Sequence, residues 1–68
     1  MKVINFGADK AQVNLTQVEL LVLNAALNEV CNGIDIFEFE TRIGSDKNSV
    51  LDFLNEVGNL LDKMDGRE

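Results

Sequence analysis

Several residue types that commonly carry chemistry are absent from this 68-residue chain, or nearly so. It has no histidine, tryptophan, tyrosine or proline, and one cysteine. A single cysteine, Cys31, excludes an internal disulfide, and the lack of histidine removes the usual ligand sets for zinc and haem. We therefore expect no metal and no cofactor. Without proline, nothing in the sequence forces a break in a helix.

The common nucleophilic enzymes are excluded in the same way. The hydroxyl groups of Thr16, Thr41, Ser45 and Ser49 have no histidine to activate them. No glycine loop of the phosphate-binding type is present. Cys31 lies on an apolar helical stripe, where we interpret it as a small buried hydrophobe and not as a nucleophile. We predict that the protein is not an enzyme.

Long apolar runs are also absent. The longest, Leu20 to Leu23, is far too short to cross a bilayer. No secretory signal follows Met1, and a free cysteine suits a reducing compartment. We expect a cytoplasmic protein that does not engage a membrane.

Positive charge is missing from the middle of the chain, whose net charge is −6. Between residues 11 and 41 there is no lysine or arginine, whereas five acidic residues lie there. A nucleic-acid partner is not expected, because such binding needs a basic footprint. The acids either keep the protein soluble or face a basic partner protein. The candidates for that second role are Glu29, Asp35, Glu38 and Glu40.

Two segments carry a capping box, the pattern in which a helix cap precedes a glutamate by three residues. Thr16 precedes Glu19 in this way, and Asp35 precedes Glu38. The cap accepts a backbone hydrogen bond, and the glutamate reaches back to the N–H group of the cap. Each box predicts the start of a helix.

Glycines mark the predicted helix ends. Residues 17–32 end before Gly33, and residues 35–43 end before Gly44, where a left-handed glycine would stop a helix. Residues 35–43 also alternate in part as a strand would, so their type stays open between helix and strand, with the capping box favouring helix.

Residues 47–64 show the clearest amphipathic pattern. Ser45 or Asp46 supplies the cap, and Gly66 marks the stop. Gly58, beside the apolar face, either allows another backbone to approach or is tolerated at a cost of ~1 kcal/mol relative to alanine.

The N-terminal region favours β structure. Residues 2–6 are rich in β-branched and aromatic side chains, residues 7–10 resemble a turn, and residues 12–15 alternate polar and apolar. These patterns predict a short strand or a small β-hairpin.

The first predicted helix has two apolar stripes, which indicates a helix that is buried at the centre of the domain or contacts something on two sides. The main stripe joins the predicted core, made of Leu23, Leu27, Ile36, Phe39, Ile43, Val50, Leu54, Val57 and Leu61. The second stripe is a candidate dimer face unless the N-terminal strand covers it, and consists of Val18, Val22, Ala25 and Ala26. A chain this short has little core of its own, which favours a second subunit.

The length allows one domain, with residues 1–15 as strand or hairpin, 16–64 as a three-helix core and 65–68 as a tail. The order of long helix, short helix, tight turn and long helix resembles the tri-helical core of helix-turn-helix and winged-helix domains. The residues that carry this resemblance are Leu15-Thr16, Glu19 to Leu23, Phe39 to Ser45, Val50 and Leu54. It implies a mainly α, helix-turn-helix-like bundle whose last helix reads DNA. Asp52 and Glu56 on that helix would repel phosphates.

Three functions follow from these observations. We favour a non-enzymatic protein–protein interaction module that self-associates as a homodimer or docks on another protein. One alternative is a helix-turn-helix DNA-binding regulator or accessory subunit. The other is an acidic inhibitor, of the immunity type, of a basic protein.

Overall fold

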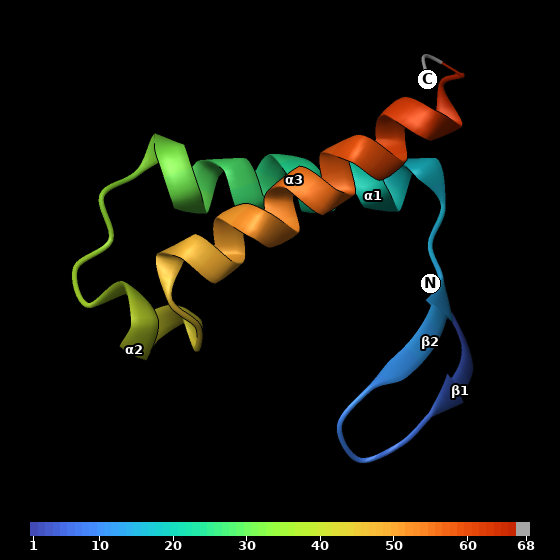
Figure 1. Ribbon diagram of the computed structural model, residues 1–68, viewed down its shortest axis with the longest axis horizontal. Coiled ribbons are helices and arrows are strands. Elements are labelled where there is room, and N and C mark those ends of the chain that lie inside the picture. Colours follow the sequence, from blue (N-terminus) through green and yellow to red (C-terminus); the bar gives the residue numbers. More distant parts are fainter. Residues whose placement is uncertain (67–68) are drawn as a thin grey trace.

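The computed structural model describes residues 1–66, so Arg67 and Glu68 of the predicted tail lie outside the described residues. The fold is mainly α, as predicted, with a two-stranded hairpin before the helices (Figure 1). The elements in chain order are β1 (Lys2–Phe6), β2 (Ala11–Asn14), α1 (Gln17–Asn28), the π-helical turn η1 (Glu29–Gly33), α2 (Phe39–Ile43) and α3 (Lys47–Met64).

The N-terminal hairpin is confirmed. β1 and β2 pair antiparallel, with an irregularity between Val3 and Asn5, and the N–H of Gly7 donates to the carbonyl of Lys10 at 2.8 Å across the turn. β2 begins and ends one residue earlier than predicted. Every residue of both strands is exposed, so the hairpin does not pack on the helices of its own chain.

The first capping box is also confirmed. The N–H of Glu19 donates to Oγ1 of Thr16 at 3.1 Å, and the N–H of Thr16 donates to Oε1 of Glu19 at 2.9 Å. The α-amino group of Met1 forms an ion pair with the same carboxylate. These contacts, the amine first, lower the pKa of Glu19 below its usual value and tie β1 to the start of α1.

The end of the first helix differs from the prediction. The N–H of Ile34 donates to the carbonyl of Glu29 at 3.0 Å, which closes a π-helical turn. Gly33 is not in the left-handed conformation, so its predicted role as a left-handed cap is wrong. A Cβ atom there would lie 2.5 Å from Cδ of Glu29, so this glycine leaves room for the carboxylate.

The predicted second capping box, from Asp35 to Glu38, is not formed. Residues 35–38 are not helical, and α2 begins only at Phe39. Glu38 is itself the residue before the helix, with a left-handed φ of 53°, and makes no side-chain cap. Gly44 ends α2 with a φ of 92°, as predicted. Since α2 has five residues and buries none of them, the helix-turn-helix-like bundle is not confirmed.

The third helix has its predicted bounds. Asp46, not Ser45, is the cap: its carboxylate accepts from the N–H of Ser49 at 3.2 Å and from Oγ of Ser49 at 2.6 Å. Gly66 adopts a left-handed φ of 74° beyond the helix end. The hydrogen bonds from Ser49 lower the pKa of the Asp46 carboxyl.

This lowered pKa predicts a loss of stability in acid. The folded chain holds Asp46 ionised more strongly than the unfolded chain does, so the stabilisation is present above the unfolded pKa of about 4. It disappears as the pH falls through the lower, folded value. Asp46→Asn keeps the cap, because asparagine caps helices equally well, but does not titrate. We expect urea unfolding to show that the free energy of unfolding decreases less between about pH 7 and about pH 3 for this variant than for the parent. Equal losses would contradict this role of Asp46.

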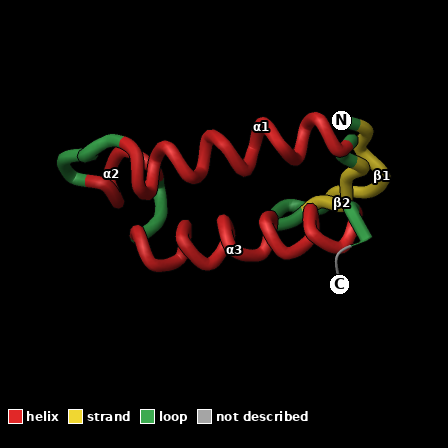
Figure 2. Tube along the Cα trace, turned by 90° about the horizontal axis from the view of Figure 1, so that it is seen from above, coloured by secondary structure: helices red, strands yellow, loops and turns green. Residues whose placement is uncertain are grey.

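The core lies between α1 and α3, which run antiparallel side by side (Figure 2). Its buried side chains are Leu20, Cys31, Val50, Val57 and Leu61. Leu23 and Leu27 pack against this core and are partly buried. Cys31 is 2% exposed, as expected for a small hydrophobe.

Two expectations about the core are wrong. Ile43 is exposed, because the short α2 does not pack into the core. The first helix is not the buried, central helix of the domain, because Leu20 is the one residue of α1 that is buried. Neither the hairpin nor α2 covers its second side.

Candidate interaction surfaces

One side of α1 has no covering element within the described chain. It carries the predicted dimer face, which we call the outer face, made of Val18, Val22, Ala25 and Ala26. Val18 and Val22 are 69% and 64% exposed, and both alanines are exposed. The N-terminal strand does not act as a lid, since its own side chains are exposed as well. The structure therefore brings these four residues together at the surface.

A second apolar surface lies along α3. Phe53, Leu60 and Met64 are each close to half exposed, although their sequence pattern places them on the apolar face of the helix. The face is wider than the single neighbour α1 can cover. The sequence analysis did not predict this surface. The feature of the sequence that could have indicated it is the width of the apolar stripe along residues 47–64.

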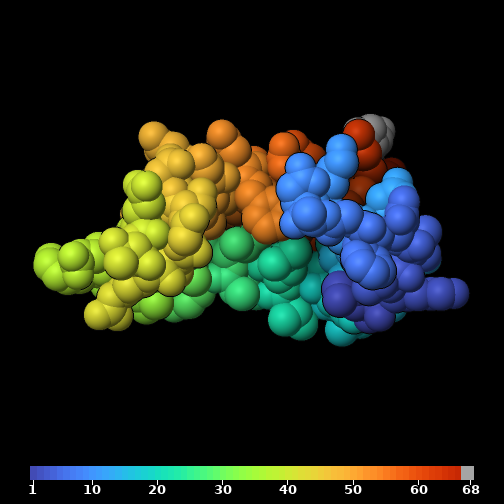
Figure 3. Space-filling model, turned by 90° about the horizontal axis from the view of Figure 1, so that it is seen from below, coloured from blue at the N-terminus to red at the C-terminus, as the bar shows by residue number. Residues whose placement is uncertain are grey.

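The hairpin and α2 project from opposite ends of the helix pair, toward the same side (Figure 1). Seen from that side, they flank the middle of α1 and α3 (Figure 3). The hairpin exposes Val3, Ile4 and Phe6, with Phe6 at 77%. Phe37, before α2, is exposed to the same extent. Each projection thus carries an uncovered aromatic ring.

The four candidate partner-facing acids lie toward the end of the molecule that carries α2. We call residues 29–40 the acidic end; it holds Glu29, Asp35, Glu38 and Glu40, all exposed. This segment contains no lysine or arginine. Ile34 and Phe37 are exposed between the acids. The acidic end is therefore both negatively charged and apolar.

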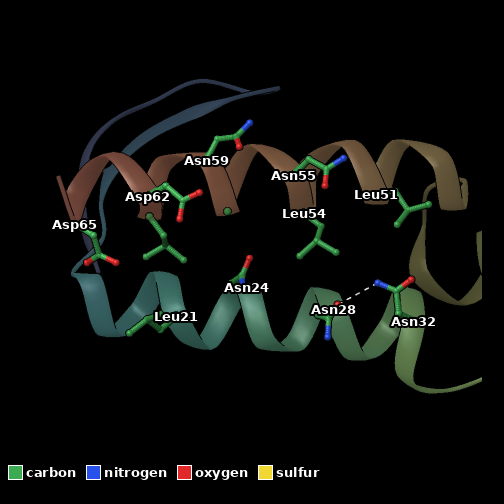
Figure 4. A pocket seen from close by; sticks show the side chains of 12 residues that line it. Leu21, Asn24, Asn28, Asn32, Leu51, Leu54, Asn55, Asn59, Asp62 and Asp65 are labelled. Atoms are coloured by element: carbon green, nitrogen blue, oxygen red, sulfur yellow. Dashed lines mark hydrogen bonds between the residues drawn. The ribbon is translucent and has the colours of Figure 1, made fainter. Parts of the chain in front are cut away.

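A groove of about 560 Å³ runs between α1 and α3 (Figure 4). Its walls carry rows of asparagines at four-residue spacing: Asn24 and Asn28 on α1 continue to Asn32 in η1, and Asn55 and Asn59 lie on α3. Nδ2 of Asn32 donates to Oδ1 of Asn28 at 3.0 Å. Leucines from both helices also line it. The groove offers hydrogen-bond donors and acceptors above an apolar floor.

Gly58 lies in this groove. A Cβ atom there would be 3.8 Å from Oδ1 of Asn24, an ordinary contact. No backbone atom from another element among residues 1–66 lies within 4 Å of that position, so the glycine is tolerated and not required by packing. The sequence pattern showed a polar edge on the first helix, but the groove depends on how the two helices face each other.

Within residues 1–66, no group of three or more metal-ligating side chains comes together. No helix in the same part of the chain is long and apolar enough to cross a membrane. Comparisons of the chain with family models, with curated proteins and with solved structures found no match.

Proposed function

We propose that this chain is a small protein–protein interaction module that self-associates as a homodimer. The observation that carries the proposal is its exposed area of 5427 Å². A compact monomer of 7.5 kDa is expected to expose about 4,250 Å². The excess of roughly 1,200 Å² is more than the ~800 Å² that one partner contributes to a standard interface.

The character of the exposed surface supports the same proposal. The outer face of α1, the apolar edge of α3 and the hairpin together leave many large apolar side chains in water. An isolated two-stranded hairpin is marginal in water unless something packs on it. Ala25 and Ala26 are small enough to let a second helix approach the outer face closely. A second copy would cover surfaces that the chain cannot cover itself.

The acidic end supports one further candidate function, which is docking to a basic protein. Its four carboxylates are exposed and have no base among them. Complementary charge of this kind speeds association and selects partners. The DNA-binding alternative lacks comparable support, because α2 is too short and too exposed to brace α3 as the last helix of a helix-turn-helix.

Sedimentation equilibrium tests the homodimer. We expect twice the chain mass of 7.5 kDa at concentrations of about 10 to 100 μM, which requires a Kd in the micromolar range or below. A single-chain mass throughout that range would refute self-association. Docking to a basic protein would then be the function to test.

A further inference from the structure

The charge of Glu29, which caps the end of α1, distinguishes between the two ways in which a symmetric pair could form. Val18, Val22, Ala25 and Glu29 follow one another at spacings of four, three and four residues. Residues at these spacings share one side of a helix. A pair that meets through the outer face therefore brings Glu29 of each copy close to the interface, at one end of the contact.

A parallel pair would place like charges together. The two Glu29 side chains would lie near each other, and so would the two acidic ends, whose four acids outnumber the one neighbouring base, Arg42 of α2. Like-charge contacts of this kind oppose association. A two-fold axis along the helices would also turn the hairpin and α2 of the second copy to the opposite side of the pair.

We propose that two copies pack with their α1 helices antiparallel, so that the hairpin of each copy lies against the acidic end of the other. This inference rests on the proposed homodimer. Lys2 and Lys10 of the hairpin are the two basic side chains among residues 1–41, and both are exposed. In this arrangement they face Glu29, Asp35, Glu38 and Glu40 of the second copy. The contact occurs twice, because the interface is symmetric.

The shape of the chain agrees with this arrangement. The hairpin and α2 project toward the same side of the helix pair (Figure 1). A two-fold axis perpendicular to α1 and parallel to these projections keeps both hairpins and both α2 helices on that side. It sets each hairpin beside the α2 region of the other copy. Phe6 and Phe37, each 77% exposed in one copy, would then shield each other from water.

Charge reversal tests the arrangement. Lys2→Glu with Lys10→Glu reverses both lysines of the hairpin and makes the net charge more negative by four, from −6 to −10. Glu38→Lys with Glu40→Lys reverses two acids of the acidic end. The matched control, Lys47→Glu with Lys63→Glu, also gives −10 but changes α3 only. The Kd of the dimer is measured for each by sedimentation, with circular dichroism to verify helix content.

We expect each of the two test pairs to raise Kd about tenfold or more in dilute salt, because four exposed charge pairs are reversed. The increase should shrink in about 0.5 M salt. Combining both pairs should restore Kd to within about threefold of the parent, and the control should stay within the same range. If the parent dimerises but the combination does not restore Kd, the antiparallel arrangement is wrong and the homodimer stands. If the parent is a single chain, the proposed function itself fails.

Discussion

Val22→Glu is expected to convert the proposed homodimer into folded single chains. Val22 lies in the middle of the outer face and is 64% exposed within one copy, so its replacement breaks few contacts inside the chain. In a symmetric pair, two new carboxylates would lie near each other and away from water. Burying unpaired like charges costs several kcal/mol, which raises Kd by about 100-fold or more.

Sedimentation measures the mass of this variant, and circular dichroism measures its helix content. Asn48→Glu is the matched control, because it adds the same charge at an exposed position of α3 outside the apolar surfaces. The control should remain a dimer. A Val22→Glu variant that sediments like the parent would show that the outer face is not the contact.

Leu61→Ala is expected to unfold the chain or come close to it. Leu61 is 7% exposed and forms the core cluster with Leu20 and Val57. Truncating a buried leucine costs ~2–5 kcal/mol, and a domain of this size has only about 5 kcal/mol to lose. Thermal unfolding at one chain concentration should show a large drop in Tm or no transition.

Leu60→Ala is the control for this truncation. It removes the same side chain from the neighbouring position, which is 45% exposed. Both variants should be made in the Val22→Glu background, so that association does not contribute to stability. There, Leu60→Ala should cost less than about 1 kcal/mol. Equal decreases in the free energy of unfolding for the two variants would contradict the assignment of Leu61 to the core.

The features that sequence predicted well depend on residues close together in the chain. The capping box of Thr16 and Glu19 closes over three residues, and the structure contains both of its hydrogen bonds. The bounds of α3 follow from the Asp46 cap and an amphipathic repeat. The hairpin follows from two short strands about a tight turn. In each case local hydrogen bonds and side-chain periodicity are sufficient.

The features that sequence did not predict depend on the path of the chain between elements. Asp35 and Glu38 have the right types and spacing for a capping box, but the left-handed backbone at Glu38 prevents one. The asparagine groove and the exposed edge of α3 depend on how α1 and α3 face each other. Neither the spacing of the asparagines nor the apolar stripe of α3 specifies how the two helices are oriented relative to each other. The outer face could be named from sequence, since it needs only the helical repeat.

The π-helical turn at the end of α1 changes the direction in which the chain leaves the first helix toward α2. Its hydrogen bond spans five residues, from Ile34 to Glu29, where an α-helix would span four. That extra residue turns everything after it by about 100° around the helix axis, compared with an uninterrupted α-helix. The hairpin, which precedes α1, is unaffected. The angular relation between the two projections therefore depends on the number of residues in that turn, together with the path of residues 34–38 that follow it. Gaining or losing one residue there would move the acidic end relative to the hairpin, and with it the contact proposed between two copies, without changing any surface side chain.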